Sequence, residues 1–183
     1  MTFRATVALC IVIGIGTGSA VSADSPANPA PLRLVLSEVQ AGSMASEQYC
    51  VLVFSDRRFH FEKASRKTGV DRIRKVYEGE FSEADWKSLE GILDSKDFRD
   101  LNVPQAVAPL ILEDAHTFTI SVARDANFQN MEFLDNKSRK PYEAQLKPLL
   151  GWWKNVRGSR MTESKAAPDP RCALDSTRPV FSQ

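Results

Sequence analysis

Residues 48–64 read QYCVLVFSDRRFHFEKA: two runs rich in β-branched and aromatic residues on either side of a polar Ser-Asp-Arg break. Runs of this kind are typical of β-strands, and the short polar break is typical of a tight turn. In the second run, Phe59 and Phe61 alternate with His60 and Glu62, as in a strand with one face on a core and one in water. We therefore predict an antiparallel hairpin in which His60 and Glu62 are exposed to solvent.

On both sides of the hairpin, similar runs and alternation predict four more strands. Two further segments repeat apolar residues at the spacing of an amphipathic helix, and Ser82 is placed to cap the first of them. The expected strands are 32–39, 48–55, 58–64, 72–81, 117–124 and 128–134, and the expected helices are 83–95 and 142–156. Because strands joined by short turns pair antiparallel, the sequence predicts an α+β fold: an antiparallel sheet of about six strands, ordered β-β-β-β-α-β-β-α, with two helices packed on one face.

The first 23 residues have the features of a secretory signal peptide. Arg4 gives a positive start, residues 7–15 are apolar and uncharged, and small residues at 21–23 offer a cleavage site. An uncleaved membrane anchor is the alternative, although the apolar run is short for that. We divide the chain into a signal peptide (1–23), a Pro-rich linker (24–31), a single α+β domain (32–157) and an irregular C-terminal tail (158–183).

Composition and charge exclude several classes of protein. The leader carries one Arg and no acid, so its removal leaves 160 residues with 23 basic and 23 acidic side chains. A neutral chain is not a strongly basic nucleic-acid binder, and no segment after the leader approaches the length of a membrane span. We expect an exported protein, periplasmic or extracellular, with no nucleic-acid partner and no transmembrane segment after signal cleavage.

Two cysteines remain after the leader, Cys50 in the apolar hairpin strand and Cys172 in the polar tail. An even number in an exported chain favours a disulfide, because the compartment oxidises thiols. A Cys50–Cys172 bridge would fasten the tail to the sheet. The alternative is a buried free thiol at Cys50 and an unrelated thiol in the tail.

The motifs of common catalytic sites are absent from the sequence, which contains only two histidines. We expect His60 to be solvated and His116 to lie at the edge of the core, since His116 shares strand parity with Phe118. Glu113, Asp114 and His116 are the one tight group of metal-ligating residue types, but such triplets are common by chance. We therefore predict no catalytic, cofactor or metal-binding residue.

Charge is segregated along the chain even though its total is balanced. Residues 57–75 and 137–160 are strongly basic, and residues 78–100 are strongly acidic. These segments are either solvated faces that pair with each other or a bipolar surface that binds a charged partner. Trp152 either fills the core or is partly exposed, in which case it joins Lys154 and Arg157 as a candidate partner-binding group.

Four segments carry a resemblance to a known family. They are Val76–Ser82 leading into a helix, Asp94–Phe98 ending it, the strand Thr117–Val122, and Leu146–Leu150 opening the last helix. Together they resemble the small emfourin-type domains, which include proteinaceous inhibitors of thermolysin-like metalloproteases, and exported bacterial proteins of the same plan. The resemblance covers about residues 76–156 and rests on hydrophobic spacing. The family's Gly-Gly-Phe-like opening is replaced here by residues 34–39, LVLSEV, so the resemblance implies an α+β, non-enzymatic domain and transfers no inhibitory residue.

These observations lead to one hypothesis and two alternatives. The first is an exported, non-enzymatic domain that binds another macromolecule, with no cofactor. The second is a proteinaceous inhibitor of a metalloprotease. The third is a hydrolase that uses carboxylates alone, for which the strand residues Glu78, Glu80 and Glu132 are the candidates.

Overall fold

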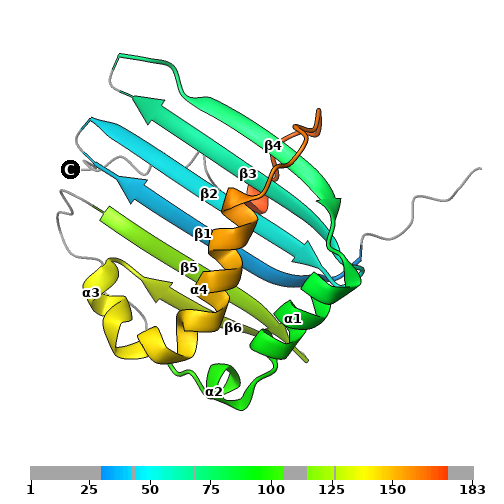
Figure 1. Ribbon diagram of the computed structural model, residues 1–183. Coiled ribbons are helices and arrows are strands. Elements are labelled where there is room, and N and C mark those ends of the chain that lie inside the picture. Colours follow the sequence, from blue (N-terminus) through cyan, green and yellow to red (C-terminus); the bar gives the residue numbers. More distant parts are fainter. Residues whose placement is uncertain (1–29, 43, 68, 105–114, 126, 173–183) are drawn as a thin grey trace, which may run out of the picture.

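Six strands form one antiparallel sheet in the computed structural model, which describes residues 30–42, 44–67, 69–104, 115–125 and 127–172 (Figure 1). The strands are β1 (Leu32–Ala41), β2 (Ala45–Phe54), β3 (Arg58–Lys67), β4 (Ile73–Glu80), β5 (Ala115–Arg124) and β6 (Asn127–Phe133). The predicted α+β class, the order of elements and the β2–β3 hairpin are confirmed.

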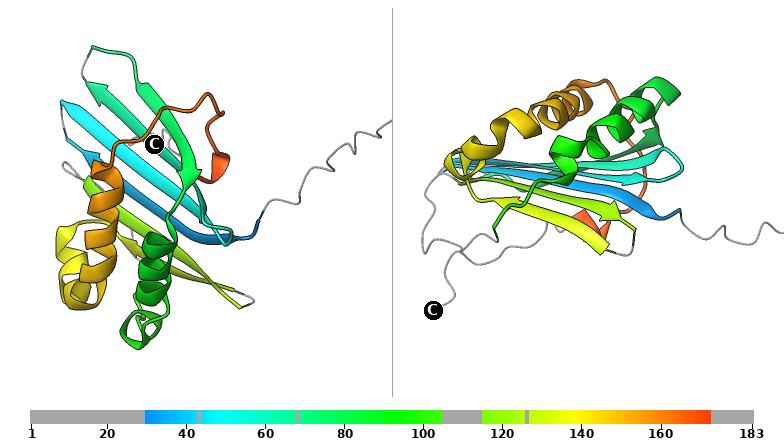
Figure 2. Two further views of the ribbon diagram at one scale, coloured as in Figure 1. Left: turned by 45° about the vertical axis from the view of Figure 1, so that its right-hand side comes forward. Right: turned by 90° about the horizontal axis from the view of Figure 1, so that it is seen from below.

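The two predicted helices lie on the same face of the sheet (Figure 2). They are α1 (Glu83–Leu93) and α4 (Glu143–Gly158), and short helical turns accompany them: α2 (Lys96–Arg99), α3 (Asn136–Arg139), η1 (Lys140–Tyr142) and η2 (Pro170–Cys172). Ser82 caps α1 as predicted, because its hydroxyl oxygen accepts a hydrogen bond from the Asp85 amide at 3.2 Å.

The strands lie in the order β4-β3-β2-β1-β5-β6, so β1 is central although it is the first strand in the chain. After β4 the chain crosses the sheet through α1 and α2, and β5 then pairs with the free side of β1. Leu36 of β1 lies opposite Val51 on one side and Ile120 on the other. The main core lies between this sheet face and the two helices, which contribute Leu89, Leu93, Leu146, Leu149 and Trp153.

The opposite face of the sheet is partly covered, which the sequence did not predict. After α4 the chain passes the exposed edge of β4, where Glu163 bridges to Tyr77 and the Ser164 amide donates to the Val76 carbonyl at 2.8 Å. It then turns under the sheet, where η2 lies on the side opposite the helices (Figure 2). His60 is only 6% exposed as a result, so its predicted solvent exposure is wrong.

Cys172 ends this path in a disulfide with Cys50 on β2. The two Cα atoms are 5.6 Å apart and the residues are 122 positions apart in sequence. Both sulfur-bearing side chains are buried with Leu52 and Ala64 in a second, smaller apolar cluster. The predicted pairing is confirmed, and the tail up to residue 172 is largely irregular, as expected.

The predicted signal peptide and residues 24–29 of the linker lie outside the described residues. Within the part of the chain that is described, no helix has the length and apolar character needed to cross a membrane.

We predict that loss of the disulfide lowers the free energy of unfolding by about 4 kcal/mol, because the bridge closes a long loop in the unfolded chain. The measurement is urea unfolding of the wild type with and without reductant, and of the double variant Cys50→Ser/Cys172→Ser. Reductant should destabilise the wild type and leave the double variant unchanged. Mass spectrometry that finds two free thiols in the exported protein would contradict the pairing.

Candidate functional site

Two carboxylates are buried in the sheet, one on each face. Glu38 of β1 faces the helices and is 4% exposed, and Glu62 of β3 faces the other way and is fully buried. A buried charge is costly unless ion pairs and hydrogen bonds replace its water. The partners of these two residues therefore decide whether each is a structural or a chemical group.

Each carboxylate oxygen of Glu38 has two partners. Its Oε1 accepts from Gln40 Nε2 at 2.6 Å and lies 2.7 Å from His116 Nε2. Its Oε2 accepts from the Trp153 indole at 2.6 Å and lies 2.9 Å from Nη1 of Arg157. Burial alone would raise the pKa of Glu38, but these hydrogen bonds and the charge of Arg157 outweigh it and lower the pKa below its ordinary value.

Arg157 and His116 close this cluster at the edge of the core. The guanidinium of Arg157 lies over the rings of Tyr49 and Trp153, 5.0 and 5.7 Å from their centroids. Burial and the hydrogen bond to Glu47 raise the pKa of Tyr49 to about 12. The partly exposed His116 lies at the core edge, as predicted. The cluster therefore fastens α4 to β1 and β5.

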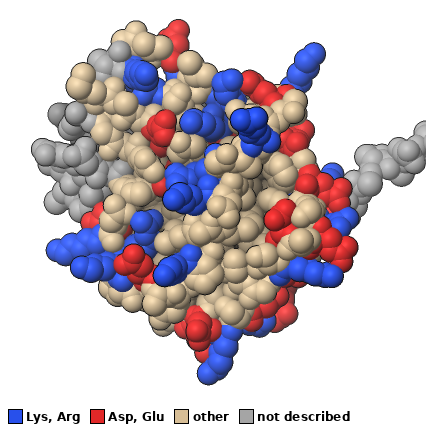
Figure 3. Space-filling model, viewed as in Figure 1, with Lys and Arg blue, Asp and Glu red and all other residues tan. Residues whose placement is uncertain are grey.

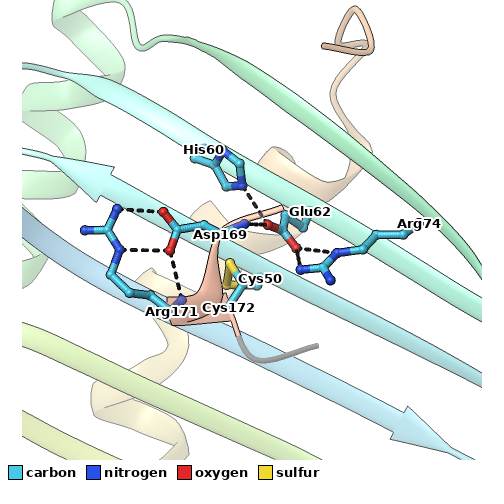
Figure 4. Close-up of a disulfide and its surroundings, with 7 residues drawn as sticks. All are labelled: Cys50, His60, Glu62, Arg74, Asp169, Arg171 and Cys172. Carbon is cyan, nitrogen blue, oxygen red and sulfur yellow. Dashed lines mark hydrogen bonds and ion pairs between the residues drawn. A yellow bond between two sulfur atoms is a disulfide. The ribbon is translucent and has the colours of Figure 1, made fainter. Parts of the chain in front are cut away.

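Glu62 is the centre of the second cluster, which lies beside the disulfide (Figure 4). His60 Nε2 is 2.7 Å from Oε1, which also accepts from the Asp169 amide at 2.6 Å. Arg74 Nε donates to the other oxygen at 2.8 Å. Burial raises the pKa of Glu62, but the hydrogen bonds from His60, Asp169 and Arg74 outweigh it and lower the pKa overall.

His60 is held by carboxylates on both ring nitrogens. Besides Glu62, the Oε1 atom of Glu78 lies 3.5 Å from Nδ1. The hydrogen bond to Glu62 raises the pKa of His60 above its ordinary value, against the effect of burial. A general base needs a ring nitrogen that is free to accept a proton, and here both nitrogens face carboxylates. His60 therefore supports Glu62, which in turn holds the tail through the Asp169 amide.

The three candidate carboxylates are not all brought together, although Glu78 and Glu80 line one hollow of about 560 Å³ with His60 and Asp169. Glu132 is exposed on β6, whereas Glu78 and Glu80 lie on β4 at the other edge of the sheet, about 24 Å away at the usual strand spacing. The described residues contain no group of three or more potential metal ligands. Glu113 and Asp114 lie outside the described residues, and His116 bonds to Glu38 instead.

An apolar groove with a volume of about 740 Å³ runs between α1 and α4 on the helical face. Its apolar lining consists of Phe59, Phe81, Ile92, Pro148, Trp152, Val156 and Met161. The aromatic rings form a series, because Phe59 packs on Phe81 with centroids 4.8 Å apart and Phe81 packs on Trp152 at 5.7 Å. Gly79 permits this arrangement, since a Cβ there would come within 2.8 Å of the Phe59 ring.

Charges of opposite sign surround the groove. In Figure 3 acidic side chains gather over α1 and basic side chains over α4, with uncharged surface between them. Glu80 and Asp85 line the α1 side, and Lys147 and Arg160 line the α4 side. The groove therefore combines an apolar floor with a charged rim, which is the usual composition of a binding site.

The three predicted partner-binding residues do not form one surface. Trp152 is 9% exposed and fills the space under the groove, so the alternative of a partly exposed Trp152 is wrong and the core-filling alternative is confirmed. Lys154 is exposed on α4 but does not line the groove. Arg157 is turned into the Glu38 cluster.

Comparison with known proteins adds no relative to this picture. No protein-family model and no curated protein matches the chain. The emfourin-type resemblance therefore stays a prediction.

We predict that Glu38→Gln destabilises the protein by about 2 to 3 kcal/mol, because the amide places a donor against groups that already donate. Glu132→Gln is the matched control, since Glu132 is exposed, and it should change the free energy of unfolding by less than about 0.5 kcal/mol. The measurement is the free energy of unfolding of both variants, from urea titration at pH 7. Equal stability of the two variants would contradict the role given to Glu38.

We also predict a pH dependence from His60. A raised pKa in the folded protein contributes stability that is fully present below the unfolded pKa of about 6.5 and is lost as pH rises through the folded pKa. The free energy of unfolding, measured by urea titration from pH 6 to pH 9, should fall more for the wild type than for His60→Gln. Parallel curves for the two proteins would show that His60 has no raised pKa.

Proposed function

We propose that this protein is an exported, non-enzymatic domain that binds a segment of another protein in the groove between α1 and α4. The observation that carries the proposal is the groove itself, with its aromatic series over the core and about 740 Å³ of space. Ligand sites are typically concave, mostly apolar and of this size, with a few polar groups at the rim.

Two features support export. The leader has the pattern of a signal peptide, and the fold includes a disulfide, a bond that persists in oxidising compartments and is rare in the cytosol. The bridge covers the face of the sheet opposite the groove, where it holds the tail over His60 and Glu62. The tail covers that face in part and leaves a hollow of about 560 Å³ whose lining includes the charged residues Arg58, Glu78 and Asp169, whereas the groove on the helical face has a mainly apolar lining.

A polypeptide segment fits the walls of the groove. Ser88 on α1 and Asn155 on α4 line it, are exposed, and make no side-chain hydrogen bond to another described residue. Their hydroxyl and amide groups can pair with a peptide main chain, while the aromatic floor takes an apolar side chain. Recognition of a segment in a groove between helices is a common mode of peptide binding.

The polar residues of the groove favour binding over catalysis. The described residues that line it include neither histidine nor cysteine. Its two carboxylates are engaged elsewhere, because Glu80 pairs with Arg57 at 2.6 Å and Asp85 accepts from the Ser82 hydroxyl at 2.6 Å. Ser82 is the serine of this lining that bonds a carboxylate, and its oxygen also accepts from the Asp85 amide as the cap of α1, so it has a structural role there.

Gly151 gives a direct test, because it lies in the groove with open space around its Cβ position. Gly151→Phe adds a ring at the groove from a Cβ position that has no atom within 4 Å, and Gly91→Phe is the control, since its Cβ position in α1 is equally open but does not line the groove. We expect selection from a random decapeptide display library to yield peptides with a large apolar residue. Their affinity should fall at least about tenfold with Gly151→Phe, as expected when a well-packed anchor is excluded, and stay unchanged with Gly91→Phe.

Urea unfolding of both variants should show that each remains folded. If no peptide is selected, or if the two variants weaken binding equally, the groove is not a peptide site and the proposal fails.

A further inference from the structure

The acidic side of the groove is neutralised in part by the chain itself. Glu80 pairs with Arg57, whereas Asp85 bonds the neutral Ser82 hydroxyl as part of the cap of α1. Beyond the rim, Glu83 pairs with Lys87 at 2.7 Å and Glu90 with Arg33 at 2.8 Å. An incoming cation on this side would therefore compete with partners that are already in place.

The basic side of the groove is not neutralised. Lys147 and Arg160 line the groove, are exposed, and make no ion pair with another residue that the structure describes. Glu143 is the one acid within α4 and lies one turn before Lys147, but no ion pair joins them. The charges at the groove without an ion pair to a described residue are therefore two positive, Lys147 and Arg160, against one negative, Asp85, which leaves a net positive charge.

The two free cations lie at different points along the groove. Lys147 is in the second turn of α4 and Arg160 lies just after its end, which corresponds to a separation of about 20 Å along the helix axis. An extended chain rises about 3.3 Å per residue, so positions six residues apart would reach both cations. The aromatic floor of Phe81 and Trp152 lies in the same groove.

From this arrangement we propose that the occupant is an extended peptide segment in which a large apolar residue is flanked by acidic residues about six positions apart. This inference rests on the proposed function and adds the chemical class of the partner. The apolar residue packs on Phe81 and Trp152, and the acidic residues lie against Lys147 and Arg160. Charge of this kind sets the choice of partner and the rate of association more than the depth of binding.

Three synthetic peptides test this inference. They share the core Ser-Leu-Phe-Leu-Ser, have blocked ends, and carry Asp, Asn or Lys at both outer positions, six residues apart. In calorimetric titrations at 50 mM salt the Asp peptide should bind about tenfold more tightly than the Asn peptide, as expected for two exposed ion pairs, and the Lys peptide should bind weakest. At 500 mM salt the three affinities should converge, because salt screens exposed charges.

Charge reversal identifies the residues responsible. Lys147→Glu/Arg160→Glu should invert the order, so that the Lys peptide binds best. Lys140→Glu/Lys154→Glu is the matched control, because it changes net charge equally at exposed positions that do not line the groove, and it should preserve the order.

Failure of this inference is distinguishable from failure of the proposed function. If the three peptides bind with equal affinity and Gly151→Phe still abolishes binding, the groove binds peptides but the acidic requirement is wrong. If no peptide binds at 1 mM while sodium dodecanoate binds and is excluded by Gly151→Phe, the occupant is a small anionic amphiphile. That result would overturn both the inference and the proposed protein partner, as would the absence of binding by any of these probes.

Discussion

The hydrogen bond from the Trp153 indole to the buried carboxylate of Glu38, 2.6 Å long, fixes α4 over the sheet. It joins residues 115 positions apart, at a site where neither group has water to replace a lost partner. Because Trp153 points to the core, the preceding residue in the helix, Trp152, points in another direction and forms the floor of the groove. The position of the groove therefore follows from a polar contact in the core, and Arg157 and His116 reinforce it from the edge.

The disulfide, on the other side of the sheet, also constrains the position of residues that line the groove. Met161 and Arg160 begin the tail and line one end of the groove, and Glu163 then bridges to the edge of β4. From there the tail reaches Glu62 through the Asp169 amide and ends at Cys172. A bond between β2 and the tail thus limits where Arg160 can lie, and the edge strand β4 gains a partner that protects it from pairing with another chain.

Local pattern predicted the elements well, because strand and helix periodicity depend on neighbours in sequence. It also assigned His60 and Glu62 to the correct face of β3, opposite Phe59 and Phe61. Their burial could not be predicted from the hairpin, since the cover is a segment about 100 residues later. Glu38 did leave a signal, because it continues the parity of Leu34 and Leu36 and so places a carboxylate on the core face. That departure from an apolar pattern is typical of a buried charge with dedicated partners, and it is the feature that sequence reasoning missed.

The distribution of charge shows why counting charges along the sequence could not identify the face that keeps unpaired cations. The acidic segment 78–100 is partly neutralised, by Arg57 from the first basic segment and by Arg33 and Arg124, which lie outside both basic segments. Pairing removes most of the negative charge on that side, whereas Lys147 and Arg160 on the other side keep their positive charge. A chain whose residues 24–183 carry no net charge can therefore present a positive groove. Because exposed ion pairs contribute little to folding stability, these two cations are free to contribute to the choice of partner instead.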